Sequence, residues 1–354
     1  MDRRQFLSLI GATSAATLLP TAVWAQQGQG VQQGQDRPAL LPQSLKPGDR
    51  VRLIAPAGVI YEDVRIEIAR ENMAGLGLDV SVGDHVLDRH GYFAGTDAAR
   101  AADIMAAFTD PAVKAVVALS GGWGAARTLP HLDFDIIRQN PKILMGFSDV
   151  TALLNAVTGK TGLVTFHGPN ATSEWTSFSV NAARRLLFAG GSGPFAHPPH
   201  TGGTLARHRG RLQTIAGGTA EGWLAGGNLT VLTALVGTPY MPDMAGAILF
   251  LEDIGEAIYR VDRMLTTLGQ AGVLDRVAGI VFGGFTDVGP DGDGFGAFAL
   301  SDILRDHVRR AGKPAYLGLM AGHRTDQLTL PIGARARLDA DARTLSLTAA
   351  AVKR

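Results

Sequence analysis

A serine stands where a predicted strand turns into a predicted helix. Residues 143–145 are an apolar run that predicts a short buried strand, Gly146 and Phe147 predict a sharp turn, and residues 150–157 predict a helix. A hydroxyl at such a turn lies beside unpaired backbone N–H groups at the positive end of the helix dipole, which can stabilise an oxyanion. Ser148 is therefore a candidate nucleophile.

The same serine also has a purely structural interpretation. A serine directly before a helix is a preferred N-cap residue, which accepts a hydrogen bond from an N–H group two or three residues further on. The nucleophile pattern Gly-x-Ser-x-Gly is incomplete here, because Val150 occupies its last glycine position. Taken alone, the stretch favours the N-cap, so the rest of the chain must decide.

A serine nucleophile needs a base, usually histidine, and an acid that holds this base in the right tautomer. Glu252 follows an apolar strand predicted for residues 247–251, and His323 follows Gly322 in a turn after residues 316–320. Both side chains would thus stand at defined points. Each also has an ordinary interpretation. For Glu252 it is the end of a strand exposed to water, and for His323 it is a histidine in a loop.

The composition excludes several classes of protein and site. Thirty-three basic and 32 acidic residues give a net charge of +1 without any basic tract, so no nucleic-acid partner is expected. The absence of cysteine excludes disulfides, thiol catalysis and thiolate metal sites. The 354 residues suffice for two ordinary domains.

The first half of the chain alternates between strands and helices. We predict strands over residues 51–55, 79–82, 115–119, 143–145 and 163–166, and helices over residues 64–76, 97–108 (capped by Thr96 or Asp97), 150–157 and 180–187. This alternation predicts an α/β fold whose N-terminal domain, residues 43–188, has three layers around a mainly parallel sheet.

A glycine turn over residues 120–124 follows one of these strands. Because ligands bind beyond the carboxyl ends of strands in such sheets, this turn and the Ser148 turn could share a crevice. The glycines match no nucleotide-binding pattern.

The second half predicts a smaller α+β domain. Residues 189–211, rich in Gly, Pro and His, are the expected interdomain crossing, and residues 212–354 form the C-terminal domain. Short alternating runs near its end predict a strand meander or barrel, and further elements are expected in the order that follows. They are helices over 229–236 and 258–268, a strand over 277–282, a helix capped by Ser301, and short strands over 327–330, 335–338 and 344–348.

Two stretches resemble metal sites only superficially. His197, His200 and His208 match no usual zinc spacing. Residues 287–294 resemble a calcium loop, but Phe298 stands where the twelfth position requires glutamate. We therefore predict no metal.

The N-terminus predicts export. Arg3 and Arg4 precede a weakly apolar segment over residues 6–19 and small residues over 23–25, as in a twin-arginine signal peptide of residues 1–25. We expect cleavage before Gln26, a disordered linker over residues 26–42 and a periplasmic protein without a membrane span. The alternative is a frayed amphipathic N-terminus of a cytosolic protein.

Several stretches, taken in order, resemble the LD-carboxypeptidase family of serine peptidases, which includes muramoyltetrapeptide carboxypeptidases and microcin C immunity peptidases. The similarity extends over residues 43–349. Its motifs are 45–51 (Leu-Lys-Pro-Gly-Asp-Arg-Val) with 55–58 (Ala-Pro-Ala-Gly), 121–124 (Gly-Gly-Trp-Gly), 145–154 (Met-Gly-Phe-Ser-Asp-Val-Thr-Ala-Leu-Leu), 166–169 (Phe-His-Gly-Pro), 226–229 (Gly-Gly-Asn-Leu), 250–256 (Phe-Leu-Glu-Asp-Ile-Gly-Glu) with 259–263 (Tyr-Arg-Val-Asp-Arg), and 322–323 (Gly-His).

The resemblance implies roles for the candidate residues. Ser148 matches the nucleophile, His323 the base and Glu252 the triad acid, with Glu256 as the alternative acid. It implies that the active site lies between the two domains, that the protein is a homodimer, and that no cofactor or metal takes part. The implied substrate is a murein tetrapeptide or muropeptide, cleaved at an L,D bond through an acyl-enzyme to release D-alanine.

The resemblance also concerns the substrate mouth. Backbone N–H groups of Gly122 and Asp149 are the expected oxyanion hole, and Gly121 and Trp123 are expected to bind substrate. Ser120 stands where many members have Arg, and Trp123 where Tyr is common, so the peptide preference is open.

Three other functions stay open at this point. The first is a same-fold serine peptidase or amidase that acts on a microcin-like acyl-adenylate, although export argues against a toxin that acts inside the cell. The second is a periplasmic muropeptide-binding protein without catalysis, which the presence of all three triad residue types argues against. The third is a structural wall protein, for which the sequence has neither repeats nor an anchoring segment.

Overall fold

The structure, a computed structural model, describes residues 39–195, 197, 205–206, 210–289 and 298–354. The predicted export signal and most of the predicted linker lie outside these residues. Disorder is the wrong prediction for the end of the linker, because Leu40 exchanges backbone hydrogen bonds with Gly162 and Val164, and Pro42 accepts one from Lys353. The folded chain therefore reaches back to Leu40.

The first sheet has six strands in the order β11-β5-β4-β3-β1-β2. Its neighbours pair in parallel except β11, which lies antiparallel to β5 at the edge. The predicted α/β class with a mainly parallel N-terminal sheet is thus confirmed. The strands are β1 (Arg50–Ile54), β2 (Asp79–Val82), β3 (Val113–Ala118), β4 (Ile143–Gly146), β5 (Thr165–His167) and β11 (Leu330–Ile332).

Helices cover both faces of this sheet. Apolar side chains of α2, α4 and α5 pack with Ile54, Val116 and Leu144 on one face, and those of α1 pack on the other. Thr96 caps α2 by accepting from the N–H group of Ala99, as predicted. The helices are α1 (Val64–Gly75), α2 (Asp97–Thr109), α3 (Ala125–Thr128), α4 (Phe134–Gln139), α5 (Thr151–Thr161) and α6 (Ser177–Ala183), with a π turn over Arg184–Phe188 and 3₁₀ turns over Leu129–His131 and Ser148–Val150.

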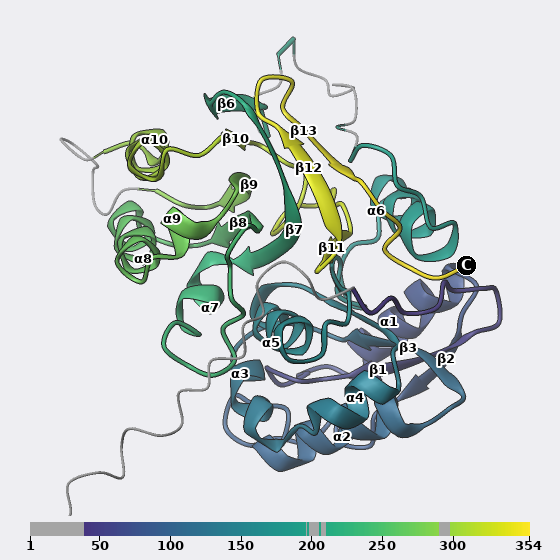
Figure 1. The fold of residues 1–354 in the computed structure, drawn as a ribbon. Helices are drawn as coiled ribbons and strands as arrows, with labels where there is room; N and C mark the ends of the chain where they lie inside the picture. The colour runs from purple at the N-terminus through teal and green to yellow at the C-terminus, as the bar shows by residue number, and fades with distance from the viewer. Residues whose placement is uncertain (1–38, 196, 198–204, 207–209, 290–297) are drawn as a thin grey trace, which may run out of the picture. The chain divides into compact units, whose positions relative to one another are not determined.

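The second sheet has seven strands in the order β13-β12-β7-β8-β9-β10-β6. Strands β7 to β10 are parallel, and β6, β12 and β13 pair antiparallel at its margins. Helices α8, α9 and α10 lie on one side of it (Figure 1). The elements are β6 (Gln213–Ala216), β7 (Thr219–Asn228), α7 (Leu229–Thr233), β8 (Ile248–Ile254), α8 (Ile258–Gln270), α9 (Val273–Arg276), β9 (Gly279–Thr286), α10 (Leu300–Ala311), β10 (Ala315–Leu317), β12 (Arg335–Asp339) and β13 (Thr344–Leu347).

Two sequence predictions for this half are wrong in detail. Only β12 and β13 form the expected meander, because β11 joins the first sheet instead. Helix α10 is not capped by Ser301: it begins after Ala299, whose N–H group donates to the carboxylate of Asp302. An aspartate in the first turn thus replaces the expected hydroxyl.

The two sheets share one apolar core. Phe166 of β5 and Met145 of β4 belong to the same buried cluster as Phe250 of β8 and Val281 of β9. The described residues form a single unit by their contacts, so the predicted boundaries at residues 188 and 212 stay predictions. No helix among the described residues is long and apolar enough to cross a membrane.

Candidate active site

Ser148 lies at a strained turn at the carboxyl end of β4. Its φ of 63° is in the left-handed region, which non-glycine residues seldom adopt outside sites where function uses the strain. Gly146 makes the tight turn possible, because a Cβ there would lie 2.8 Å from Cγ1 of Val150. The turn lifts the serine hydroxyl off the end of the sheet, as nucleophile elbows do.

The N-cap interpretation of Ser148 is wrong. The 3₁₀ turn over Ser148–Val150 follows Phe147 and has no side-chain cap, and α5 starts only at Thr151. Oγ of Ser148 lies instead 3.0 Å from Nε2 of His323.

His323 connects Ser148 to a carboxylate. Its Nδ1 lies 2.7 Å from Oε2 of Glu252, and its backbone N–H group donates to the same oxygen at 3.1 Å. Two bonds from one residue to one oxygen fix the ring relative to the carboxylate. The alternative acid, Glu256, does not contact His323; it accepts from the hydroxyl of Thr230 and pairs with Arg260.

The Glu252 carboxylate is completely buried, and Glu252 lies inside β8, which runs past the predicted strand end at residue 251 to Ile254. Burial by itself raises the pKa of this carboxyl, but the His167 ring, whose Nε2 lies 3.9 Å from Oε1, and the hydrogen-bonded His323 outweigh it and lower the pKa to about 2. Gly322 allows this approach, because a Cβ there would lie 2.7 Å from Cβ and Cγ of Glu252. Glu252 is therefore ionised at neutral pH and can orient the His323 ring.

The glycine turn after β3 meets the Ser148 turn, as predicted. A Cβ on Gly121 would lie 2.8 Å from Cβ of Ser148 and 3.3 Å from the backbone nitrogen of Asp149. Gly122, with φ of 109°, packs against Gly58, and Trp123 is 49% exposed. The turn thus brings the backbone of Gly121 to Ser148 and carries an exposed indole two residues further on.

Buried charges hold the glycine turn in place. The Arg100 guanidinium donates to the carbonyl oxygens of Pro56 and Gly124, and the Asp149 carboxylate accepts from the N–H group of Ala125 at 2.7 Å. Burial raises the pKa of Asp149 to about 6, although the Ala125 N–H group and the charge of Arg100 oppose this rise.

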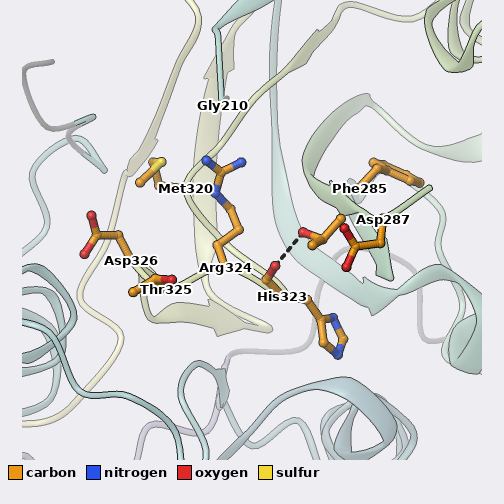
Figure 2. Close-up of a pocket in the computed structure, with 9 residues that line it drawn as sticks. Gly210, Phe285, Asp287, Met320, His323, Arg324, Thr325 and Asp326 are labelled. Atoms are coloured by element: carbon orange, nitrogen blue, oxygen red, sulfur yellow. Dashed lines mark hydrogen bonds between the residues drawn. The ribbon is translucent and has the colours of Figure 1, made fainter. Parts of the chain in front are cut away.

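A cavity of about 550 Å³ opens beside His323. Figure 2 shows the Arg324 guanidinium pointing toward Gly210, with the His323 ring turned the other way. Thr286 supports the site from β9 by donating its hydroxyl to the carbonyl oxygen of His323. The cavity offers charges of both signs, from Asp287, Arg324 and Asp326.

Reasoning from the sequence gave no role to His167 or Arg324, although both lie at this site. His167 ends β5, so its place at the carboxyl end of a buried strand was a usable signal. Of the three histidines discounted as metal ligands, His197 contacts the carbonyl oxygen of Gly318, and His200 and His208 lie outside the described residues, as does most of the discounted calcium loop. In the described part of the chain, no cluster of three or more His, Asp or Glu residues is suited to a metal ion.

The comparisons with known proteins identify the family of the chain. Residues 51–168 match the model of the LD-carboxypeptidase N-terminal domain, and residues 221–338 match that of the C-terminal domain. A probable murein peptide carboxypeptidase of Bacillus subtilis is 37% identical over 312 residues, which are 87% of this chain and 94% of that protein. The murein tetrapeptide carboxypeptidase of Pseudomonas aeruginosa is 35% identical over 312 residues, 84% of this chain and 95% of the relative.

A solved structure of the microcin C7 self-immunity protein MccF in complex with glutamyl sulfamoyl guanosine has a similar fold. Its TM-score is 0.80 at 26% identity, over 89% of this chain and all of that one. The fold and the site define a serine peptidase. The chain belongs to the LD-carboxypeptidase family and is a serine carboxypeptidase.

Proposed function

We propose that Ser148, His323 and Glu252 are a catalytic triad that removes the terminal D-alanine from a murein tetrapeptide. The observation that carries this proposal is the hydrogen-bonded chain from Ser148 Oγ through His323 to Glu252 Oε2. The names of the Bacillus and Pseudomonas relatives point to murein peptides. The charged cavity beside His323 suits a peptide with ionised groups.

The reaction has two halves. His323 Nε2 takes the proton of Ser148 Oγ, which attacks the carbonyl carbon of the penultimate residue, and His323 then returns the proton to the leaving amine of D-alanine. Backbone N–H groups of Asp149 and Gly122 stabilise the oxyanion, each such donor being worth about 3 to 4 kcal/mol. Water, activated by His323, then hydrolyses the acyl-enzyme.

The test is mass spectrometry after the purified chain is incubated with disaccharide tetrapeptide. Wild type should release one D-alanine, and Ser148→Ala should lower the rate by at least about 10³-fold while unfolding at the same temperature. Glu252→Gln and Glu256→Gln separate the two candidate acids, because only the first should impair turnover. Equal release by wild type and Ser148→Ala would overturn the proposal.

A second candidate activity follows from the likeness to MccF, whose solved complex holds an aminoacyl sulfamoyl nucleoside. Exposed Trp123 lies two residues after Gly121, which contacts Ser148, and offers an aromatic surface on which a base could stack. Turnover of an aminoacyl sulfamoyl nucleoside, but not of the tetrapeptide, would favour this activity. A non-catalytic binding protein would leave Ser148 unlabelled by a fluorophosphonate.

We propose as well that the chain is exported to the periplasm by the twin-arginine route. The support is the sequence of residues 1–25. N-terminal sequencing of the native protein should find Gln26 first in a periplasmic fraction, and replacement of Arg3 and Arg4 by Lys should keep it in the cytoplasm. The homodimer implied by the family resemblance is a separate proposal, which light scattering of the purified chain tests.

A further inference from the structure

His167 is a buried histidine on the far side of the Glu252 carboxylate. It ends β5, between β4 and β11, and none of its side chain is exposed. Neither ring nitrogen has a hydrogen-bond partner among the described residues. Buried polar atoms are nearly always paired, so two unpaired nitrogens on one ring need an explanation.

One oxygen of the Glu252 carboxylate, Oε1, does not bond to His323 and faces His167. Oε2 takes both bonds from His323, whereas Oε1 is buried and has no partner among the described residues. Nε2 of His167 lies 3.9 Å from this Oε1. That gap is about 1 Å longer than a hydrogen bond, so a small rotation of the carboxylate or of the ring would close it.

Neighbouring residues hold the His167 ring in this position beside Glu252. The ring packs edge-on against Phe250, with centroids 5.0 Å apart, and lies near Phe147, which itself contacts the His323 ring at 4.9 Å. Gly227 leaves the space that the ring occupies, because a Cβ there would lie 3.2 Å from Cδ2 of His167. The two histidines thus approach the carboxylate from different segments, His167 from the end of β5 and His323 from the turn between β10 and β11.

We propose that His167 is a positioning residue, whose Nε2–H group donates to Oε1 of Glu252 and clamps the carboxylate between two histidines during turnover. The inference rests on the proposed triad. His167 belongs to the sheet that carries Ser148, and Glu252 to the second sheet. The bond therefore fixes the orienting acid relative to the nucleophile as well as to the base.

The test uses variants that differ in where they can donate. His167→Gln places an amide nitrogen as many bonds from Cα as Nε2, whereas His167→Asn is one carbon shorter and His167→Leu has no donor. His167→Asn and His167→Leu should lower kcat for the tetrapeptide by about 10- to 100-fold, with KM changed less than about twofold. The reason is that the unpaired Glu252 oxygen leaves the carboxylate, and with it the His323 base, misplaced. His167→Gln should retain kcat within about fivefold.

The rate at which a fluorophosphonate labels Ser148 is a second readout that needs no peptide. This labelling rate should be lower in His167→Leu and His167→Asn than in His167→Gln. A wild type that is labelled but releases no D-alanine would refute the proposed substrate, and the labelling rates would still decide the role of His167. An unlabelled wild type would overturn the triad, and the positioning role with it.

If His167 acted through packing alone, the results would differ. His167→Gln would then lose as much activity as His167→Leu, and each loss of activity would go with a lower unfolding temperature. That pattern, or full activity in both Asn and Leu, overturns the proposal. If the Leu variant does not fold, the Gln and Asn pair, which keeps an amide at the site, decides alone.

Discussion

At the scale of single residues, the site depends on how closely groups approach Ser148. Gly121 lies against the serine, yet its own φ is not in the left-handed region. The φ angle at this position is therefore open to alanine, and the added Cβ would clash with Ser148 and lie close to the backbone of Asp149.

We expect Gly121→Ala to lower kcat about 100-fold. Its Cβ would lie 2.8 Å from Cβ and 3.0 Å from Oγ of Ser148, so Ser148 must move as a whole, and a shift of about 1 Å costs about that much. Gly75→Ala is the matched control, because nothing lies within 4 Å of its Cβ. Tetrapeptide kinetics and thermal unfolding measure both, and an active Gly121→Ala would contradict the steric argument.

Asp149 predicts a pH dependence of stability. Between its ordinary pKa of 3.8 and the raised value of about 6, the folded protein holds a proton that the unfolded chain has lost, so this group's contribution to stability falls as the pH rises. Asp149→Asn cannot titrate. Relative to wild type, its free energy of unfolding should rise by about 1 to 3 kcal/mol from pH 4 to pH 7.

Urea unfolding of both proteins at the two pH values measures this difference. A difference that is flat, or that falls toward pH 7, would show that the Asp149 carboxyl is not held in its neutral form by burial.

The residue types of the site were predictable, and their contacts were only partly so. Ser148 and His323 lie in turns, and Glu252 lies near the carboxyl end of β8, at places that a sequence pattern marks, so their neighbourhood could be expected. The left-handed φ of Ser148 could not be expected, because it depends on packing around Gly146. The pattern of strand residues also does not choose between Glu252 and Glu256 as the partner of His323, because both lie at the carboxyl end of the same predicted strand.

At the scale of elements, the position of α5 connects the two sheets. Asn155 of α5 donates to the carbonyl oxygen of Gly226 in β7 and accepts from the N–H group of the same glycine. Next to it, the hydroxyl of Thr151 accepts from the N–H group of Asn228. The helix that follows Ser148 is thereby bonded to β7, the strand beside β8, and β8 carries Glu252.

We expect Asn155→Ala to destabilise the protein by about 2 to 4 kcal/mol, because it leaves two buried backbone groups of Gly226 without partners. Urea unfolding measures this loss, and kcat should fall as well, since Ser148 and Glu252 are held by opposite sides of the junction. The exposed Asn181 is the control, and its change to alanine should stay within about 0.5 kcal/mol. Equal stabilities of wild type and Asn155→Ala would show that the bonds of Asn155 do not stabilise the junction between α5 and β7.

The element types were more predictable than their partners. Apolar alternation marks β12 and β13 correctly, but it cannot say that β11, a few residues earlier, pairs with β5 across the molecule. Strand pairing over such a separation is decided by the shared core, which no local pattern contains. The same limit applies to α10, where an aspartate inside the first turn accepts from Ala299 in place of the predicted serine cap.

At the scale of the whole molecule, the two halves of the chain share one apolar core and contribute strands to the same sheet. The core cluster that includes Phe166 and Met145 of the first sheet also includes Phe250, Tyr316 and Leu330 from the second half. β11 supplies the edge strand beside β5, so the sheet with the nucleophile is finished only by residues near the end of the chain. The residues of the proposed triad therefore come together only in the complete fold.

This predicts that residues 39–188 do not fold alone. The fragment would expose the edge of β5 and the apolar face that the second sheet covers, and an exposed face and edge of this kind favour aggregation. We expect its circular dichroism to show no cooperative thermal transition, whereas residues 39–354 unfold in one. A soluble, monomeric fragment with a sharp transition would mean that the first sheet is a domain in its own right, and that β11 is an addition rather than part of its core.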